Sequence, residues 1–205
     1  MTVLARSLFL SLVLAGLASC TAIAALDRAA EPQNVYELRP PDDIPVARAT
    51  RSTQLIIEVP TASGAVGTDR ILIRPTPSQI AYLPDARWSE PAPVMLQTAL
   101  VEALLATNAF RFVGRRPLGP SGDVALVSDL TGFETRIAPE TGTNSVQIRL
   151  TVRLVRERDA RILATQTFAS SVPIPDTSTP AIIAGFEQTS ADVLEQTIRW
   201  IITAL

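Results

Sequence analysis

Residues 146–154 read Val-Gln-Ile-Arg-Leu-Thr-Val-Arg-Leu, and this stretch decides the fold class. Apolar and polar side chains alternate along its whole length, which is typical of a β-strand with one buried face and one solvent-facing face. The sequence Arg-Asp-Ala-Arg at 158–161 then indicates a turn, and residues 162–170 return with a second strand-forming run. The pattern therefore predicts an antiparallel β-hairpin.

Further strands and two helices are expected on either side of this hairpin. Apolar and β-branched runs predict strands at 35–38, 54–59, 70–74, 79–82, 110–113 and 123–130. Ser89-Glu-Pro91 predicts a helix start, because a capping residue and a proline precede leucines at helical spacing, and Asn108 is expected to end that helix. A second helix is expected from Thr179-Pro180 to the last residue. This order predicts an α+β fold, a single domain with one mostly antiparallel sheet packed by two helices.

The composition excludes several classes of site. The chain has 205 residues, with 18 basic and 20 acidic side chains; every basic residue is Arg, there is no His, and there is one Cys. Without His or Lys, a Ser-His or Cys-His nucleophilic site, a Schiff-base lysine and a P-loop lysine are excluded. One Cys supports neither a structural zinc site nor an intramolecular disulfide, so no metal or cofactor is expected. With a net charge of -2 and no basic run longer than two, no nucleic acid partner is expected.

The N-terminal residues are typical of an export signal. Arg6 precedes an apolar run that ends in Leu17-Ala18-Ser19-Cys20. These four residues resemble the lipobox of bacterial lipoproteins, which implies cleavage before Cys20 and acylation of that residue. An uncleaved membrane span over residues 7–26 is the alternative, because that stretch carries no charge and is about the ~20 residues that a spanning helix needs.

The lipobox sets the expected organisation of the chain. We expect a lipoprotein signal peptide at 1–19, a lipidated N-terminus and tether at 20–34, and a folded α+β domain at 35–205. Thr21 follows the Cys, where an Asp holds enterobacterial lipoproteins at the inner membrane. The same resemblance therefore implies a periplasm-facing protein anchored in the outer membrane by its acyl chains.

Two features leave alternatives open. The glycine-containing segment 61–68 either forms a phosphate cradle or is a plain loop, and no Lys accompanies its glycines. A basic face on the hairpin either contacts a lipid headgroup or a partner, or is a solvated strand face. The residues of that face are Arg149, Arg153, Arg156, Arg158 and Arg161.

Several segments together resemble the ABC-type transport auxiliary lipoproteins, the family of the paraquat-inducible operon lipoprotein. They are Tyr36-Glu-Leu38, Leu55-Ile-Ile-Glu-Val-Pro60, Arg70-Ile-Leu-Ile-Arg74, Ile80-Ala-Tyr82 and Ala86-Arg-Trp-Ser-Glu-Pro91. The resemblance is most specific over 70–91, where it implies structural or interface roles for Arg74, Tyr82, Arg87 and Trp88. One departure is Thr61-Ala-Ser-Gly64, since members of the family often carry a Tyr-Leu pair there.

The resemblance implies a non-catalytic accessory of an ABC-type lipid transport system between membranes. Such a system pairs a permease and an ATPase with an MCE-type protein, and the auxiliary lipoprotein docks or assembles this machinery on the periplasmic side. Members of the family also form rings, which implies that homo-oligomers can form. Two alternatives remain: a periplasmic carrier that holds acyl chains in an apolar cleft, and a carboxylate-only enzyme such as a glycosidase. Asp42, Asp43 and Glu134 are the candidate acids for the enzyme.

Overall fold

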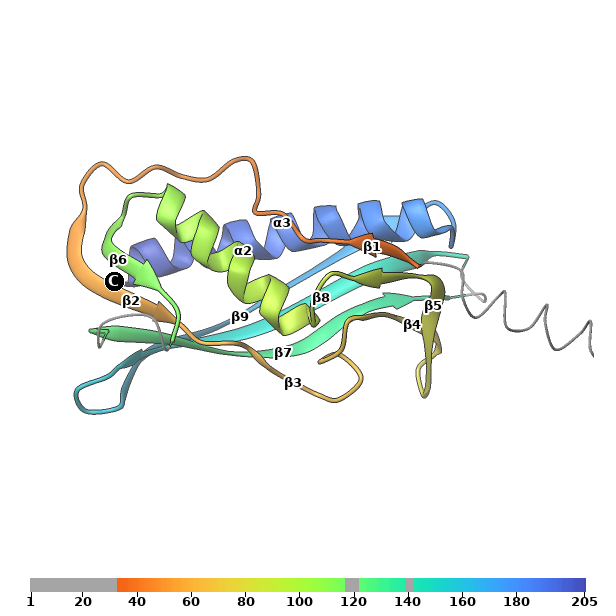
Figure 1. Cartoon of the computed structure of the whole chain (residues 1–205), viewed down its shortest axis with the longest axis horizontal. Helices are drawn as coiled ribbons and strands as arrows, with labels where there is room; N and C mark the ends of the chain where they lie inside the picture. Colours follow the sequence, from red (N-terminus) through yellow and green to blue (C-terminus); the bar gives the residue numbers. More distant parts are fainter. Residues whose placement is uncertain (1–32, 117–121, 139–141) are drawn as a thin grey trace, which may run out of the picture. The chain divides into compact units, whose positions relative to one another are not determined.

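The alternating stretch lies in β8 (Asn144–Arg156), a strand of 13 residues. In this computed structural model, which describes residues 33–116, 122–138 and 142–205, β8 pairs antiparallel with β7 (Val124–Arg136) and β9 (Arg161–Ile174) (Figure 1). The apolar residues of the alternating stretch, such as Leu150, are buried, whereas Arg149 is exposed. The predicted hairpin is therefore confirmed.

The predicted signal peptide and lipobox lie outside the described residues, as does the tether up to residue 32. This includes Leu17, Ala18, Ser19 and Cys20. Residues Asn34–Leu205 form one compact unit. Among the described helices, none combines the length and the apolar character needed to cross a bilayer.

β7 has a long second edge, and three short strands pair with it in parallel, one after another. These strands are β2 (Arg51–Ile57), β3 (Thr61–Ala62) and β4 (Arg70–Thr76). Three more strands extend the sheet, the first beyond β2 and the others beyond β4: β6 (Phe110–Gly114), β5 (Gln79–Trp88) and β1 (Asn34–Tyr36). The result is one mixed nine-stranded sheet in which the longest ladders are antiparallel.

A β-bulge at Thr131 changes which residues of β7 face the helices. Thr131 lies between the pairs Leu130–Leu150 and Gly132–Arg149, so no residue of β8 stands opposite it in the register. Up to the bulge the even-numbered side chains face the helices, and beyond it the odd-numbered side chains do, as the buried pairs along β8 show. An extra residue in one strand has this effect because successive side chains point to opposite faces.

The two helices of the described residues, α2 (Ala92–Ala106) and α3 (Thr179–Ala204), cover the same face of the sheet (Figure 1). Gly185 lets α3 approach the sheet closely. A Cβ atom at this position would lie 2.7 Å from Val146 Cγ2 and 2.6 Å from Ile174 Cγ2. The side chains between sheet and helices form one continuous apolar core, and the acyl-binding cleft of the alternative carrier hypothesis would have to open within it.

The predicted α+β class is confirmed, whereas several boundaries differ; among them, the strand predicted at 79–82 continues to Trp88. The strand predicted at 123–130 continues to Arg136, because the bulge interrupts the alternation without ending the strand. The segment 61–68, predicted as a loop, contains β3. The first helix begins at Ala92 rather than at Ser89, because Pro91 takes the N-cap position.

Candidate functional site

The face of the sheet opposite the helices carries the polar side chains of β7 and β8. Three adjoining hollows lie on it, with volumes of about 590, 470 and 310 Å³, and Thr131 lines all three. We call this surface the open-face groove. The residues that define it are Thr61, Arg74, Asp129, Thr131, Glu134, Arg136, Arg149, Thr151 and Arg153.

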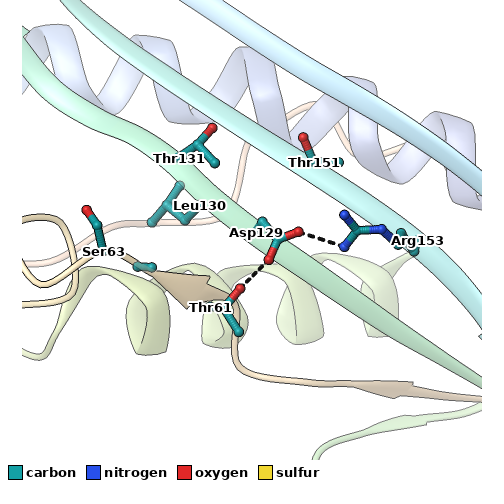
Figure 2. Close-up of a pocket in the computed structure, with 8 residues that line it drawn as sticks. Thr61, Ser63, Asp129, Leu130, Thr131, Thr151 and Arg153 are labelled. Atoms are coloured by element: carbon teal, nitrogen blue, oxygen red, sulfur yellow. Dashed lines mark hydrogen bonds and ion pairs between the residues drawn. The ribbon is translucent and has the colours of Figure 1, made fainter.

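The largest hollow is built around Asp129 (Figure 2). The Thr61 hydroxyl donates a short hydrogen bond to Asp129 Oδ1, and Arg153 Nη1 donates to Asp129 Oδ2 over 2.6 Å. The hydrogen bond from Thr61, followed by that from Arg153, holds the pKa of the Asp129 carboxyl below its usual value. Asp129 is therefore an ionised carboxylate that ties β3 and β8 to β7.

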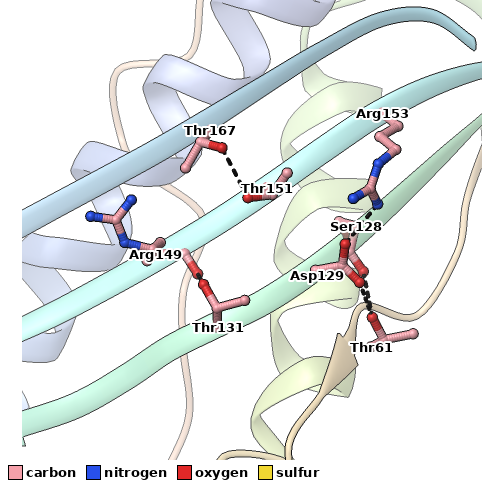
Figure 3. A network of polar contacts seen from close by, with 8 residues as sticks. All are labelled: Thr61, Ser128, Asp129, Thr131, Arg149, Thr151, Arg153 and Thr167. Atoms are coloured by element: carbon pink, nitrogen blue, oxygen red, sulfur yellow. Dashed lines mark hydrogen bonds and ion pairs between the residues drawn. The ribbon is translucent and has the colours of Figure 1, made fainter.

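The groove continues along β8 to Arg149 (Figure 3). The hydroxyls of Thr151 and Thr167 hydrogen-bond each other over 2.9 Å, and either oxygen can be the donor. Thr131 Oγ1 donates to the Arg149 carbonyl over 3.5 Å, a weak bond that involves only the backbone of Arg149. Within the described part of the chain, the Arg149 guanidinium has no hydrogen-bond or ion-pair partner.

Glu134 lies at the far end of the groove and is only 3% exposed. Arg74 Nε donates a short hydrogen bond to its Oε2, and Arg136 Nε donates to its Oε1 over 2.9 Å. Because each carboxylate oxygen is held by an arginine, Glu134 links β4 to β7 as a doubly paired anion. The other acids considered for a glycosidase, Asp42 and Asp43, are exposed and lie outside strands and helices. The described residues contain no group of three or more potential metal ligands.

The four family-motif residues occupy different environments. Arg74 belongs to the groove. Tyr82 lies under Arg70, whose Cζ is 3.9 Å from the ring centroid. Arg87 Nη1 is 3.5 Å from Asp69 Oδ2. Trp88 is 1% exposed and belongs to the core.

The expected basic face divides into two parts. Arg149 and Arg153 lie in the groove. Arg156 instead pairs with Asp159 at the hairpin turn through two hydrogen bonds of 2.9 and 2.7 Å. Arg158 follows in that turn and Arg161 begins β9.

Sequence reasoning missed the roles of Thr61, Asp129 and Thr131. Thr61 and Asp129 are 68 residues apart in the chain, and no local pattern connects them. Gly132 was the available signal for the bulge, because a glycine inside a strand often marks one. A Cβ atom at Gly132 would lie 3.3 Å from Arg149 Cβ, so glycine at this position also avoids a tight contact with the arginine opposite it.

Comparisons with known proteins agree with this fold. The sequence pattern of the ABC-type transport auxiliary lipoprotein component family matches residues 36–197. The crystal structure of a protein from Xanthomonas campestris is similar, with a TM-score of 0.71 and 27% identity, over 83% of this chain and 96% of that chain. A second crystal structure, of an uncharacterized protein, has a TM-score of 0.64 over 83% of this chain and 99% of its own, and at 17% identity it supports the fold alone.

A relative by sequence is an uncharacterized protein of Bradyrhizobium diazoefficiens. It is 26% identical over 174 residues, which are 83% of this chain and 45% of that protein. The chain therefore spans less than half the length of this relative.

Proposed function

The chain belongs to the ABC-type transport auxiliary lipoprotein component family, and on this premise we propose that it docks or assembles an MCE-associated lipid transport machinery on the periplasmic side of the outer membrane. It is an auxiliary lipoprotein component of ABC-type transport, and as a lipoprotein it is membrane-anchored. The observation that carries the proposal is the family match, which extends over nearly the whole described domain. We assign it no catalytic step, because the acids of the groove are held in ion pairs.

We propose that Cys20 carries the acyl chains, with Leu17, Ala18 and Ser19 as the rest of the lipobox. Residues 1–19 would then be removed, residues 20–34 would be the tether, and 35–205 the working domain. Each buried CH₂ group contributes about 0.8 kcal/mol, so two or more acyl chains give a stable anchor where a single chain gives a reversible one. The test is palmitate labelling of the protein and of Cys20→Ala, and label retained by the variant would contradict the assignment.

The proposed mechanism is geometric. An anchor and a tether hold the domain near its partner, so that docking becomes an intramolecular step at a high effective concentration. The helices cover one face of the sheet (Figure 1). The open-face groove lies on the other face, which makes it our candidate docking surface. Arg149 and Arg153 are two of the four arginines that give that surface its positive charge.

The docking proposal can be tested by recovering partners from native membranes. The tagged full-length protein is crosslinked in cells, purified in detergent and analysed by mass spectrometry. We expect a permease, an ATPase and an MCE-type protein to be enriched over a tagged, unrelated lipoprotein of the same membrane. Recovery of the protein without any component of an ABC transporter would overturn the proposal. Phospholipid bound stoichiometrically to the purified protein would instead favour a carrier that holds acyl chains in an apolar cleft.

A further inference from the structure

We propose that the open-face groove binds an extended acidic segment of a partner protein, whose carboxylates recur about every four residues. This inference rests on the proposed function, because it assigns a surface and a partner chemistry to the docking step. Three observations support it: the spacing of the arginines, an unbalanced positive charge, and small side chains between the arginines. Figure 3 shows two of the arginines, Arg149 and Arg153.

The arginines of the groove recur at a regular spacing along the strands. Arg149 and Arg153 are four residues apart on the same face of β8, which corresponds to about 13 Å at 3.3 Å per residue. Arg136 of β7 pairs in register with Ser145 of β8, four residues beyond Arg149 in the same direction. The three guanidinium groups therefore start from positions about 13 Å apart along the strand direction.

The charge of the groove is not balanced by its own acids. Four arginines, at 74, 136, 149 and 153, face two carboxylates, so the local charge is 4 − 2 = +2. Asp129 is engaged by Arg153 and Thr61, and Glu134 by two arginines. Neither carboxylate is left to neutralise Arg149. An incoming carboxylate would supply the missing charge, and a guanidinium binds it through two parallel hydrogen bonds.

The surface between the arginines is formed by small residues and by threonine hydroxyls. Arg149 is flanked in register by Gly132 on β7 and Ala169 on β9. The hydroxyls of Thr131 and Thr151 line the hollows beside it, and such groups can hydrogen-bond the backbone of a bound segment. An extended chain places every second side chain on the same side, so acids four residues apart would match the 13 Å steps.

An extended peptide fits these observations better than a membrane surface does. The residues that line the groove are mostly polar or charged, so hydrogen-bonding groups are distributed along its whole length, as an extended peptide requires. The exposed apolar side chains of this hairpin, Ile162 and Leu163, lie instead at the start of β9. Residues 162–175 carry no charge, so the β9 side of the groove adds no acid that would repel the segment.

The test measures binding of labelled peptides to the full-length protein in neutral detergent. The probe is a fluorescein-labelled peptide of twelve residues with Glu at every fourth position among Ser, Thr and Ala. Two matched peptides carry Gln at those positions, or the same Glu residues in one adjacent cluster. We expect saturable binding of the spaced peptide that weakens with salt, weaker binding of the clustered peptide, and no binding of the Gln peptide. Equal binding of the spaced and clustered peptides would overturn the proposed spacing.

The affinities of two variants then show whether the peptide binds in the open-face groove. Arg149→Gln is expected to weaken binding of the spaced peptide by about fivefold, the factor that corresponds to about 1 kcal/mol for one exposed ion pair. Arg111→Gln is the matched control, because Arg111 is exposed on β6 and lies outside the groove. An unchanged affinity in Arg149→Gln would overturn the proposal. Binding of vesicles with anionic lipid that is lost in Arg149→Gln, without any peptide binding, would overturn it in favour of a membrane contact.

The result of the peptide-binding test can be distinguished from the result of the crosslinking test of the proposed function. If the transport machinery is recovered from membranes and the acidic peptide does not bind, the groove assignment is wrong and the docking role stands. If the peptide binds as expected but no ABC component is recovered, the groove stands and the proposed partner is wrong.

Discussion

Replacing Trp88 should separate the two roles that the sequence left open for it, core or interface. Trp88 is 1% exposed, and its indole packs against two phenylalanine rings, with centroid distances of 5.6 Å to Phe133 and 5.1 Å to Phe186. Trp88→Ala is therefore expected to lower the free energy of unfolding by about 3–5 kcal/mol, the usual cost of removing a buried aromatic side chain.

Trp88→Phe is the sharper variant. The indole Nε1 is buried and has no hydrogen-bond partner among the described residues. Removing a buried unsatisfied donor is worth about 1–3 kcal/mol, whereas the smaller ring leaves a void that costs about 1–2 kcal/mol. Since the two contributions nearly cancel, we expect Trp88→Phe to have a stability within about 1 kcal/mol of the parent.

Urea unfolding followed by far-ultraviolet circular dichroism measures all the variants, because the signal does not depend on tryptophan. Trp200→Ala is the control, since Trp200 is only partly buried and meets Phe168 at a centroid distance of 5.9 Å. We expect it to lose less stability than Trp88→Ala. A Trp88→Phe variant as unstable as Trp88→Ala would refute the argument about the unsatisfied donor. A Trp88→Ala variant as stable as the parent would contradict the core role and favour the interface role for Trp88.

Three further predictions concern the close helix contact and the two carboxylates of the groove. Gly185→Ala should lower the melting temperature, because overpacking against Val146 costs about 1–3 kcal/mol and the gain in helix propensity is about 1 kcal/mol; a higher melting temperature would contradict the close approach. Glu134→Gln should lower the free energy of unfolding by about 1–2 kcal/mol, because two arginines lose their counterion; an unchanged urea midpoint would show that neither ion pair contributes. The pKa of Asp129 is lowered in the folded state, so its contribution to stability is present above about pH 4 and is lost as the pH falls through the lowered pKa. The free energy of unfolding of Asp129→Asn should therefore fall less than that of the parent as the pH is lowered. Identical curves of unfolding free energy against pH, from about pH 5 to 2, would contradict this.

The secondary structure was largely predictable because the buried face leaves a local signal. The alternation over 146–154 gave the position, the buried side and the partner of β8, and the order of strands and helices gave the α+β class. Both helices were predicted from their proline-containing starts and their apolar spacing, with an error of a few residues at Ser89. These features depend on residues close together in the sequence.

The open-face groove was not predictable because its contacts join distant segments. Thr61 meets Asp129 across 68 residues, and Arg74 meets Glu134 across 60. The partners come together only because β3 and β4 both pair with the same edge of β7. A sequence shows that a run forms a strand, but no local pattern shows which edge that strand will join.

The bulge at Thr131 connects the core to the groove. Without the extra residue, the alternation that buries Leu126 and Leu130 would continue, so Glu134 would point into the helices and Phe133 into solvent. The bulge reverses this order, places Phe133 against the aromatic core and brings Glu134 to the open face. The same irregularity explains why the alternation stops near residue 130 in the sequence although the strand continues. The bulge that ends the apolar–polar alternation of β7 therefore also builds the far end of the groove. For this reason a bulge beside a candidate site is better interpreted as a functional feature than as a defect.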